Sequence, residues 1–126
     1  MNWFFIGLAS LAVLGAMWFA LSRLALKGEV VDLRGRSEVP IVLTERGFEP
    51  AHIQISLGTK VTFTTTRPKQ FWPASNAHPT HELYPEFDPK EPIESRQSWS
   101  FVFTKPGTWG YHDHVRSYFT GIVYVD

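Results

Sequence analysis

Short apolar stretches separated by glycine and proline turns constrain the fold of this chain more than any other feature. After residue 27 apolar residues recur at every second position over short distances, and no stretch has the spacing of an amphipathic helix. A turn is predicted at Gly47–Pro50 and a long loop over Asn76–Arg96. The pattern indicates an all-β fold, an antiparallel sandwich or barrel. Its predicted strands are Pro40–Thr44, His52–Ser56, Val61–Thr66, Phe71–Ser75, Ser98–Thr104, Trp109–His114 and Gly121–Val125.

The composition excludes several classes of function. The 126-residue chain has 12 lysines and arginines against 12 acidic residues, and its positive residues are scattered, which does not indicate nucleic-acid binding. The chain has no cysteine, so disulfides, thiolate ligands and cysteine nucleophiles are all excluded. Any metal ion must therefore be held by nitrogen or oxygen atoms.

An uncharged segment near the N-terminus has the length of a transmembrane helix. Residues 3–21 number about 19, close to the roughly 20 that cross a bilayer, and Trp3 and Trp18 would lie near the two ends. A cleaved signal peptide is the alternative, but the segment lacks a basic start and exceeds the usual apolar run. We expect residues 1–26 to be a retained anchor, residues 27–39 a linker, and residues 40–126 one domain.

Four of the five histidines form two pairs. His112 and His114 lie two positions apart on a predicted strand and so share one of its faces, whereas Asp113 takes the other. His78 and His81 lie in the long loop. Imidazole binds copper, zinc and nickel, and among divalent ions copper binds most tightly. We expect these four histidines to hold one metal ion, with copper as the first choice and zinc as the second.

Three segments of the chain resemble the cupredoxin family. Gly47–Phe63 is similar to that family's N-terminal strand pair, Ser98–Tyr111 to the hairpin before its metal loop, and Gly121–Val125 to its closing strand. The resemblance covers Pro40–Asp126 and implies a Greek-key β-sandwich. The stretches Trp-Pro-Ala-Ser, His-Pro-Thr-His and Tyr-His-Asp-His resemble those of small bacterial cupredoxin-like domains, a divergent subgroup without the copper-binding cysteine.

The usual blue copper site of that family is not carried over. The family uses two histidines, a cysteine and a methionine, and the resemblance places the first histidine at Phe71, the cysteine at Asp113, the second histidine at Arg116 and the methionine at Phe119. Without a thiolate there is no copper–sulfur bond to produce a type 1 centre. We expect Asp113 to contact Arg116, because this contact would neutralise a buried carboxylate. The alternative role of Asp113 is to orient a metal ligand.

Other polar residues near the histidines have simpler explanations. Glu82, Glu86 and Asp88 are expected to form a solvated acidic rim, with oxygen ligation of the metal as the alternative. His52 stands alone after a turn and is expected to be structural or exposed to solvent. The tryptophans and other large aromatic residues of the domain are expected to form its core.

These observations predict a membrane-anchored, cupredoxin-like domain that binds copper through a histidine cluster without blue colour, in metal binding and delivery or electron transfer. The alternative is a metal-free module with a structural or protein-interaction role that uses residues 76–96 as its contact surface. An enzyme is the third and least favoured hypothesis. Strand alternation points Asp113 away from both neighbouring histidines, and no glycine-framed serine lies nearby.

The expected location is the cell membrane, crossed once, with the domain on the extracytoplasmic side, periplasmic or extracellular. A membrane or extracytoplasmic protein is the expected partner besides the metal ion. However, Arg23, Lys27, Arg34 and Arg36 follow the apolar segment, and the positive-inside rule would then favour a cytoplasmic domain. The sequence therefore leaves the side of the membrane open.

Overall fold

The structure is a computed structural model that describes residues 15–17, 28–77 and 83–126. Most of the expected anchor, together with His78 and His81, lies outside the described residues. Residues 15–17 are helical. No helix within the described ranges has the length and apolar character that crossing a bilayer requires.

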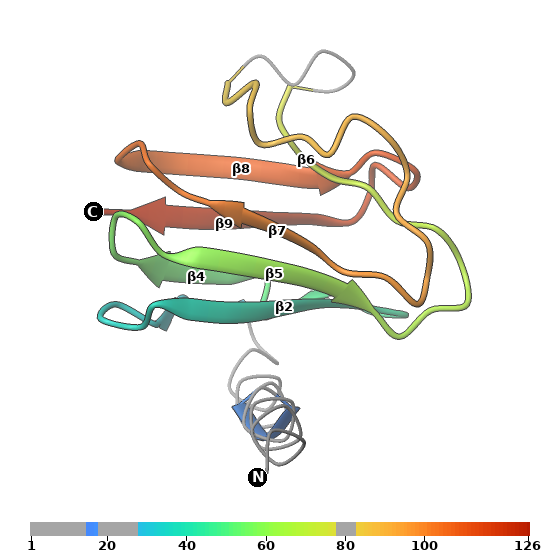
Figure 1. The fold of residues 1–126 in the computed structure, drawn as a ribbon, viewed down its shortest axis with the longest axis horizontal. Coiled ribbons are helices and arrows are strands. Elements are labelled where there is room, and N and C mark those ends of the chain that lie inside the picture. The colour runs from blue at the N-terminus through green and yellow to red at the C-terminus, as the bar shows by residue number, and fades with distance from the viewer. Residues whose placement is uncertain (1–14, 18–27, 78–82) are drawn as a thin grey trace, which may run out of the picture.

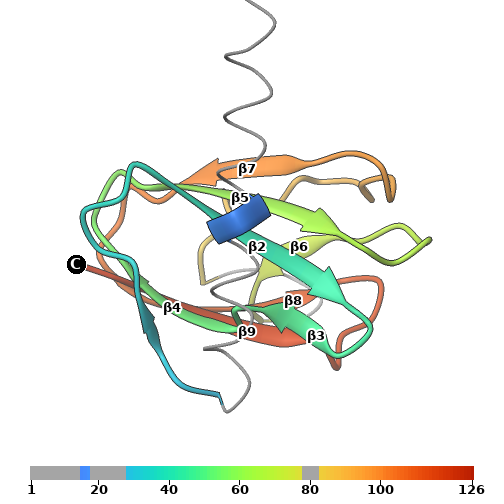
Figure 2. The ribbon, with the colours of Figure 1, turned by 90° about the horizontal axis from the view of Figure 1, so that it is seen from below.

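Two β-sheets pack face to face (Figure 1). The five-stranded sheet has the order β1-β4-β9-β8-β6, and the four-stranded sheet has the order β3-β2-β5-β7. The view in Figure 2 separates β2, β5 and β7 from β4, β9 and β8. The strands are β1 Val31–Asp32, β2 Glu38–Thr44, β3 Gly47–Glu49, β4 His52–Ile55, β5 Lys60–Thr65, β6 Pro73–Ser75, β7 Trp99–Val102, β8 Gly107–Asp113 and β9 Thr120–Val125.

The sandwich was predicted correctly, but its sheets are mixed rather than purely antiparallel. Strand β2 pairs with β5 in parallel, and β4 pairs in parallel with both β1 and β9. Parallel neighbours cannot be joined by a tight hairpin. Here the chain leaves β2, passes through β3 and then β4 in the other sheet, and returns as β5. The apolar pattern does not reveal strand direction, so this feature was not predictable from it.

Two further segments differ from expectation. The predicted turn at Gly47–Pro50 is strand β3, which pairs with β2 through Thr44 and Gly47, so the turn lies at Glu45 and Arg46. Part of the expected linker also belongs to the sandwich: β1 pairs with β4, and the Leu33 side chain is buried. Both strands are too short to show an alternating pattern.

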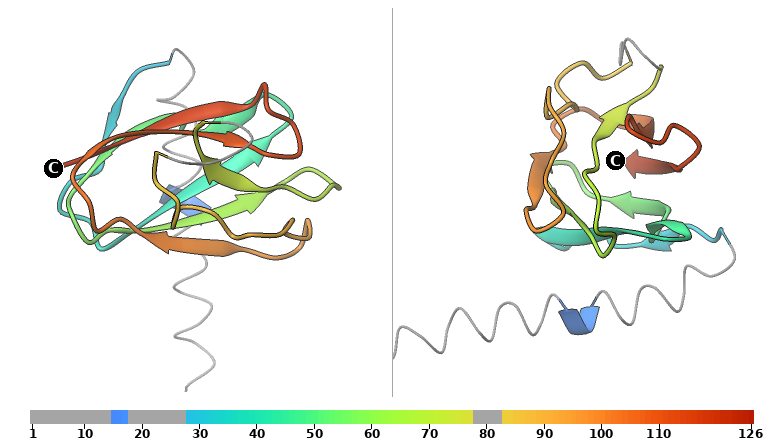
Figure 3. Two further views of the ribbon diagram at one scale, coloured as in Figure 1. Left: turned by 90° about the horizontal axis from the view of Figure 1, so that it is seen from above. Right: turned by 90° about the vertical axis from the view of Figure 1, so that its right-hand side faces the viewer.

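The core follows the period-two alternation that the sequence predicts. In β4, for example, Ile53 and Ile55 are fully buried while the intervening Gln54 is half-buried. The connection from β6 to β7, drawn in yellow to orange in Figure 3, crosses from one sheet to the other. It contributes Tyr84 and Phe87, which are 1% and 0% exposed, to the aromatic core. The long segment is therefore partly a core element.

The end of β8 positions the histidine pair. Strand β8 lies between β9 and β6, with His112 opposite Thr120 on one side and Ala74 on the other. Tyr111 is fully buried between the sheets. Its hydroxyl lies so close to Gly121 that a Cβ there would come within 2.4 Å of it. The start of β9 is thus packed tightly against Tyr111 of β8.

Candidate metal centre

His112 and His114 lie on the same side of the chain at the end of β8, as the sequence predicts. Their ring centroids are 6.0 Å apart, with the ring planes inclined at 47°. His112 is 2% exposed, whereas His114 is half-buried. Tyr111 and Asp113, which alternate with them, are fully buried in the sandwich. The same few residues thus present an inner, packed side and an outer side that carries imidazoles.

Asn76 holds the ring of His112. Its side-chain Oδ1 lies 2.8 Å from Nδ1 of His112. Its backbone N–H donates to the carbonyl of Gly110, at 3.0 Å, and its own carbonyl accepts from the N–H of Leu83, also at 3.0 Å. The described residues on both sides of the 78–82 segment are therefore tied to each other and to the outer side of β8.

Trp72 forms the other wall of the outer side. Its ring centroid is 4.5 Å from that of His114, and its carbonyl accepts a 2.7 Å hydrogen bond from the His114 N–H. Its indole Nε1–H donates to Oδ1 of Asp88 at 2.8 Å. Asp88 also accepts from the backbone N–H of Lys90 at 2.8 Å, and its side chain is 8% exposed. His114 is thus packed against a tryptophan that is itself fixed by a carboxylate.

The expectation of a solvated acidic rim holds for only one of its described members. Asp88 is mostly buried because it accepts hydrogen bonds from Trp72 and Lys90. Glu86 is exposed and lies 3.3 Å from the ammonium of Lys105. A backbone hydrogen bond within Glu86, and then the bond from Lys105, lower the pKa of the Glu86 carboxyl. Glu82 lies outside the described residues.

The structure brings together two of the four predicted ligands, His112 and His114. Within residues 28–77 and 83–126, no group of three or more histidine or acidic side chains is arranged to hold a metal ion. His52 has the structural role expected of it, since its Nδ1 lies 3.2 Å from the carbonyl of Gly28. Asn76 was not identified from the sequence, because an asparagine in a polar loop gives no signal of the side chain it will meet.

Asp113, which the sequence resemblance places at the cysteine position of the cupredoxins, is buried on the inner side. Its Oδ1 accepts from the backbone N–H of Trp72 at 2.8 Å and of Val115 at 3.3 Å. Its Oδ2 is buried without a hydrogen-bond partner. Burial raises the pKa of this carboxyl, although the two backbone hydrogen bonds oppose the shift. The Asp113 carboxylate therefore joins the residue before β6 to the start of the loop between β8 and β9.

The predicted contact between Asp113 and Arg116 is wrong, since no ion pair or hydrogen bond joins these two described side chains. Backbone hydrogen bonds from Arg116 to the Asp113 carbonyl and from Asp113 to the Phe119 carbonyl close the loop instead. A different cation, Arg67, packs on the ring of Phe119 at 5.1 Å and lies 3.4 Å from Glu45. Backbone amides bind the Asp113 carboxylate directly, and the charges of Arg67 and Arg116 act on it without contact and lower its pKa.

The inner position does not fit a type 1 copper ion. Phe71 lies one residue before Trp72, whose N–H binds Asp113, so the first-histidine and cysteine positions do meet at this end of the sandwich. Phe71 and Phe119, however, carry no donor atom, and the guanidinium of Arg116 has no lone pair for a metal. One buried carboxylate is the remaining donor, which is insufficient for a copper site.

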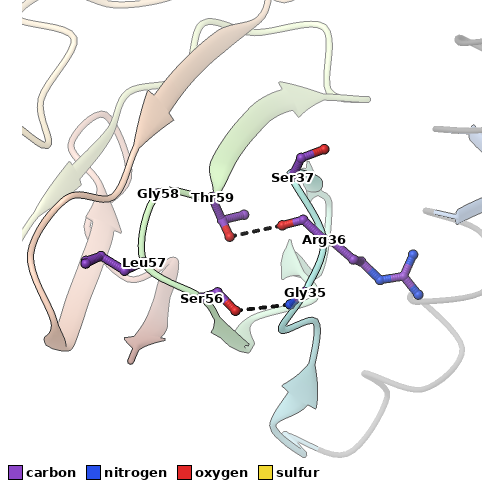
Figure 4. A pocket seen from close by; sticks show the side chains of 7 residues that line it. All are labelled: Gly35, Arg36, Ser37, Ser56, Leu57, Gly58 and Thr59. Atoms are coloured by element: carbon purple, nitrogen blue, oxygen red, sulfur yellow. Dashed lines mark hydrogen bonds between the residues drawn. The ribbon is translucent and has the colours of Figure 1, made fainter.

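A cavity of about 200 Å³ lies at the opposite end of the sandwich (Figure 4). It lies between residues 35–37 and the turn 56–59, where the Leu57 N–H donates to the carbonyl of Asp126. Two of its hydroxyls are already engaged: Ser56 accepts from the Gly35 N–H, and Thr59 donates to the Arg36 carbonyl. The Arg36 side chain points away from it. No histidine or acidic residue lines this cavity, so the outer side of β8 is the stronger candidate.

Comparison with solved structures places the fold among the cupredoxins. The purple cupredoxin from Nitrosopumilus maritimus is 20% identical over 69% of this chain and 98% of its own, with a TM-score of 0.59. A reduced mutant of amicyanin is 19% identical over 73% of this chain and 85% of its own, with a TM-score of 0.61. No protein-family model and no curated protein matches the chain.

A third neighbour is the copper-containing nitrite reductase from Thermus scotoductus. It is 20% identical over 71% of this chain, with a TM-score of 0.57, but this chain spans only 22% of that protein's length. The resemblance predicted from the sequence is therefore confirmed for the fold. The chain is a cupredoxin-like domain, and its lack of cysteine agrees with a divergent member of that fold.

Proposed function

We propose that this protein binds one copper ion through His78, His81, His112 and His114, in a non-blue form, for metal binding and delivery or for electron transfer. The observation that carries the proposal is the 6.0 Å separation of the His112 and His114 rings. A metal–nitrogen bond of about 2.0 Å keeps the centroids of two imidazoles on one ion within roughly 6.5 Å of each other. The 6.0 Å separation of the His112 and His114 centroids is within this limit.

Chain length supports the participation of the other pair. His78 follows Asn76 by two positions, and His81 precedes Leu83 by two. Consecutive Cα atoms are about 3.8 Å apart, so neither histidine Cα can be more than about 8 Å from the Cα of those fixed neighbours. Asn76 bonds both His112 and Leu83, so the described residues that flank this pair lie close to the outer side of β8, which supports a shared site.

The donor set favours copper, with zinc as the second choice. Four imidazole nitrogens suit tetragonal copper(II), and zinc would need a tetrahedral arrangement of the same ligands. One structural neighbour is a copper-containing enzyme, which supports copper as the ion. Without a thiolate, the centre would absorb visible light only weakly.

We further propose that residues 1–26 anchor the protein in the cell membrane by a single span, with the domain on the extracytoplasmic side. The uncharged stretch from Trp3 to Leu21 supports the anchor. A membrane or extracytoplasmic protein would then donate copper to the site, receive copper from it or exchange electrons with it.

Copper titration of the full-length chain in detergent tests the metal site. Calorimetry should give one copper(II) per chain, and EPR should show a tetragonal signal with nitrogen hyperfine structure. Replacing His112 and His114 by alanine should weaken binding at least 100-fold, whereas His52→Ala, the matched control, should not. Affinity should fall below about pH 6.5, where free imidazole becomes protonated. The absence of stoichiometric binding would favour the metal-free module, in which the double substitution changes only local packing.

A further inference from the structure

We propose that Asn76 is the positioning residue of this metal site, because it selects Nε2 of His112 as the metal-binding nitrogen; the inference rests on the proposed function. The Asn76 Oδ1 is 2.8 Å from the His112 Nδ1. An amide oxygen can only accept a hydrogen bond, so Nδ1 must carry the proton. A neutral imidazole protonated at Nδ1 presents its lone pair at Nε2, on the far side of the ring from Asn76.

The backbone of Asn76 is held in place by three hydrogen bonds. Its backbone N–H donates to Gly110, its carbonyl accepts from Leu83, and the Ser75 hydroxyl donates to the same carbonyl at 3.0 Å. The start of the Asn76 side chain is therefore fixed beside β8, and this short side chain reaches the His112 ring from there. The 2.8 Å bond forms only when Nδ1 of His112 points toward Asn76.

Gly110 makes room for that amide. It precedes His112 by two positions and so lies on the same face of β8. A Cβ added at Gly110 would come within 2.7 Å of Nδ2 of Asn76. A side chain at this position would push the amide away and break its bond to His112. The glycine within Trp-Gly-Tyr-His is thus part of the site, although it carries no ligand atom.

Such a partner changes affinity more than stability. A histidine whose tautomer and ring orientation are set in advance does not lose that freedom when the metal binds. Loss of the hydrogen-bond partner of a ligating histidine typically weakens metal binding 10- to 100-fold. The structure therefore predicts that Asn76 controls copper affinity without touching the ion.

Nitrogen-15 NMR of the metal-free, full-length chain in detergent tests the first step without any copper. The wild-type His112 should show the tautomer protonated at Nδ1. Asn76→Ala should give a mixture of tautomers, and Gly110→Ala should do the same. Asn76→Asp keeps the acceptor and should preserve the Nδ1–H form. Thr108→Ala, an exposed position on the same face of β8, is the matched control and should leave the His112 signals unchanged.

Copper titration of the same variants tests the second step. Asn76→Ala and Gly110→Ala should weaken copper(II) binding about 10- to 100-fold, and Asn76→Asp should restore it to within a few-fold of wild type. A wild-type His112 protonated at Nε2, or an unchanged affinity in Asn76→Ala, would overturn the inference. The tautomer of His112 is measured on the wild-type protein, so this part of the test does not depend on whether any variant folds. If the wild type has the Nδ1–H tautomer but binds no copper, the proposed function itself fails and the positioning role fails with it.

Discussion

The inner and outer sides of one strand end differ in chemistry although their residues alternate in the sequence. On the inner side lies Asp113, which the sequence resemblance places at the cysteine position of the cupredoxins, as it places phenylalanines at two other ligand positions. On the outer side, His112 and His114 lie 6.0 Å apart next to Asn76. In this cupredoxin-like sandwich the inner side thus carries one carboxylate, whereas two imidazoles lie on the opposite side of the same strand end.

The two sides differ in the hydrogen-bond partners that their polar groups find. The inner side is closed by packing, and its carboxylate is used to bind two backbone amides. The outer side contains polar groups whose partners come from other segments, such as the amide of Asn76. The inner side therefore lacks the donor atoms of a metal site, whereas the outer side carries two imidazoles, although His112 is itself only 2% exposed. The four predictions below test this division, from the largest expected effect to the smallest.

Gly121→Ala should cause the largest loss of stability, because it overfills the inner side. The new Cβ would come within 2.4 Å of the Tyr111 hydroxyl, and a fully buried ring cannot move aside. We expect a loss of about 3 kcal/mol in the free energy of unfolding, measured by urea denaturation. Thr120→Ala, at the exposed neighbouring position, should change it by less than about 0.5 kcal/mol. A loss below about 1 kcal/mol in Gly121→Ala would show that the inner side is not tightly packed.

Asp113→Asn should stabilise the protein at pH 7, by less than Gly121→Ala destabilises it, because it removes a buried charge and keeps the oxygen that binds Trp72 and Val115. Burial raises the pKa of Asp113 in the folded state above its unfolded value, so the ionised form is disfavoured by folding. The cost is complete above the folded pKa, declines as the pH falls below it, and is gone once the pH is below the lower pKa of the unfolded chain. The gain in Asp113→Asn should therefore shrink in acid, which thermal melts from pH 7 to pH 4 can measure.

Two controls accompany that experiment. Asp32 hydrogen-bonds Arg34, which lowers the pKa of the Asp32 carboxyl to about 2, so Asp32→Asn should lose stability at neutral pH and recover in acid. The two aspartates thus predict pH dependences of opposite sign. Copper affinity should not change in Asp113→Asn. If it falls tenfold or more, copper binds the inner side and the division between the sides is wrong.

Trp72→Phe should cost about 1 kcal/mol, because the indole N–H no longer binds Asp88. It also provides an optical test of the outer side. The Trp72 ring is 4.5 Å from that of His114, so copper(II) at His114 should quench the fluorescence of Trp72. The quenched component should be absent from Trp72→Phe and retained in Trp99→Phe. Equal quenching in both variants would place the ion elsewhere.

Tyr111→Phe should have the smallest effect, from neutral to about 1 kcal/mol of stabilisation. The Tyr111 hydroxyl is buried and has no hydrogen-bond partner, and burial raises its pKa well above the usual range. Removing an unsatisfied polar group from a packed site relieves its desolvation penalty. Chemical denaturation would measure the change. A clear destabilisation would mean that this hydroxyl has a partner on the inner side.

Much of the fold could be predicted from the sequence because the relevant signals are local. Alternation in segments such as Val61–Thr66 predicted the strands, and the i, i+2 spacing of His112 and His114 predicted their shared side, which the ring distance confirms. The parallel pairings were missed because alternation is the same for either strand direction. The burial of Phe87 was missed because a proline-rich, acidic segment does not resemble a core element.

The sequence by itself determined which atoms are available: no sulfur ligand from cysteine, two histidines on one side of β8, and phenylalanines at two family ligand positions. Those properties depend on residue type and on neighbours along the chain. Only the tertiary structure decided that Asp113 binds backbone amides rather than Arg116, and that Asn76 meets His112 across 36 positions of sequence. Such contacts depend on how segments distant in the chain pack together, which local patterns of residues do not encode.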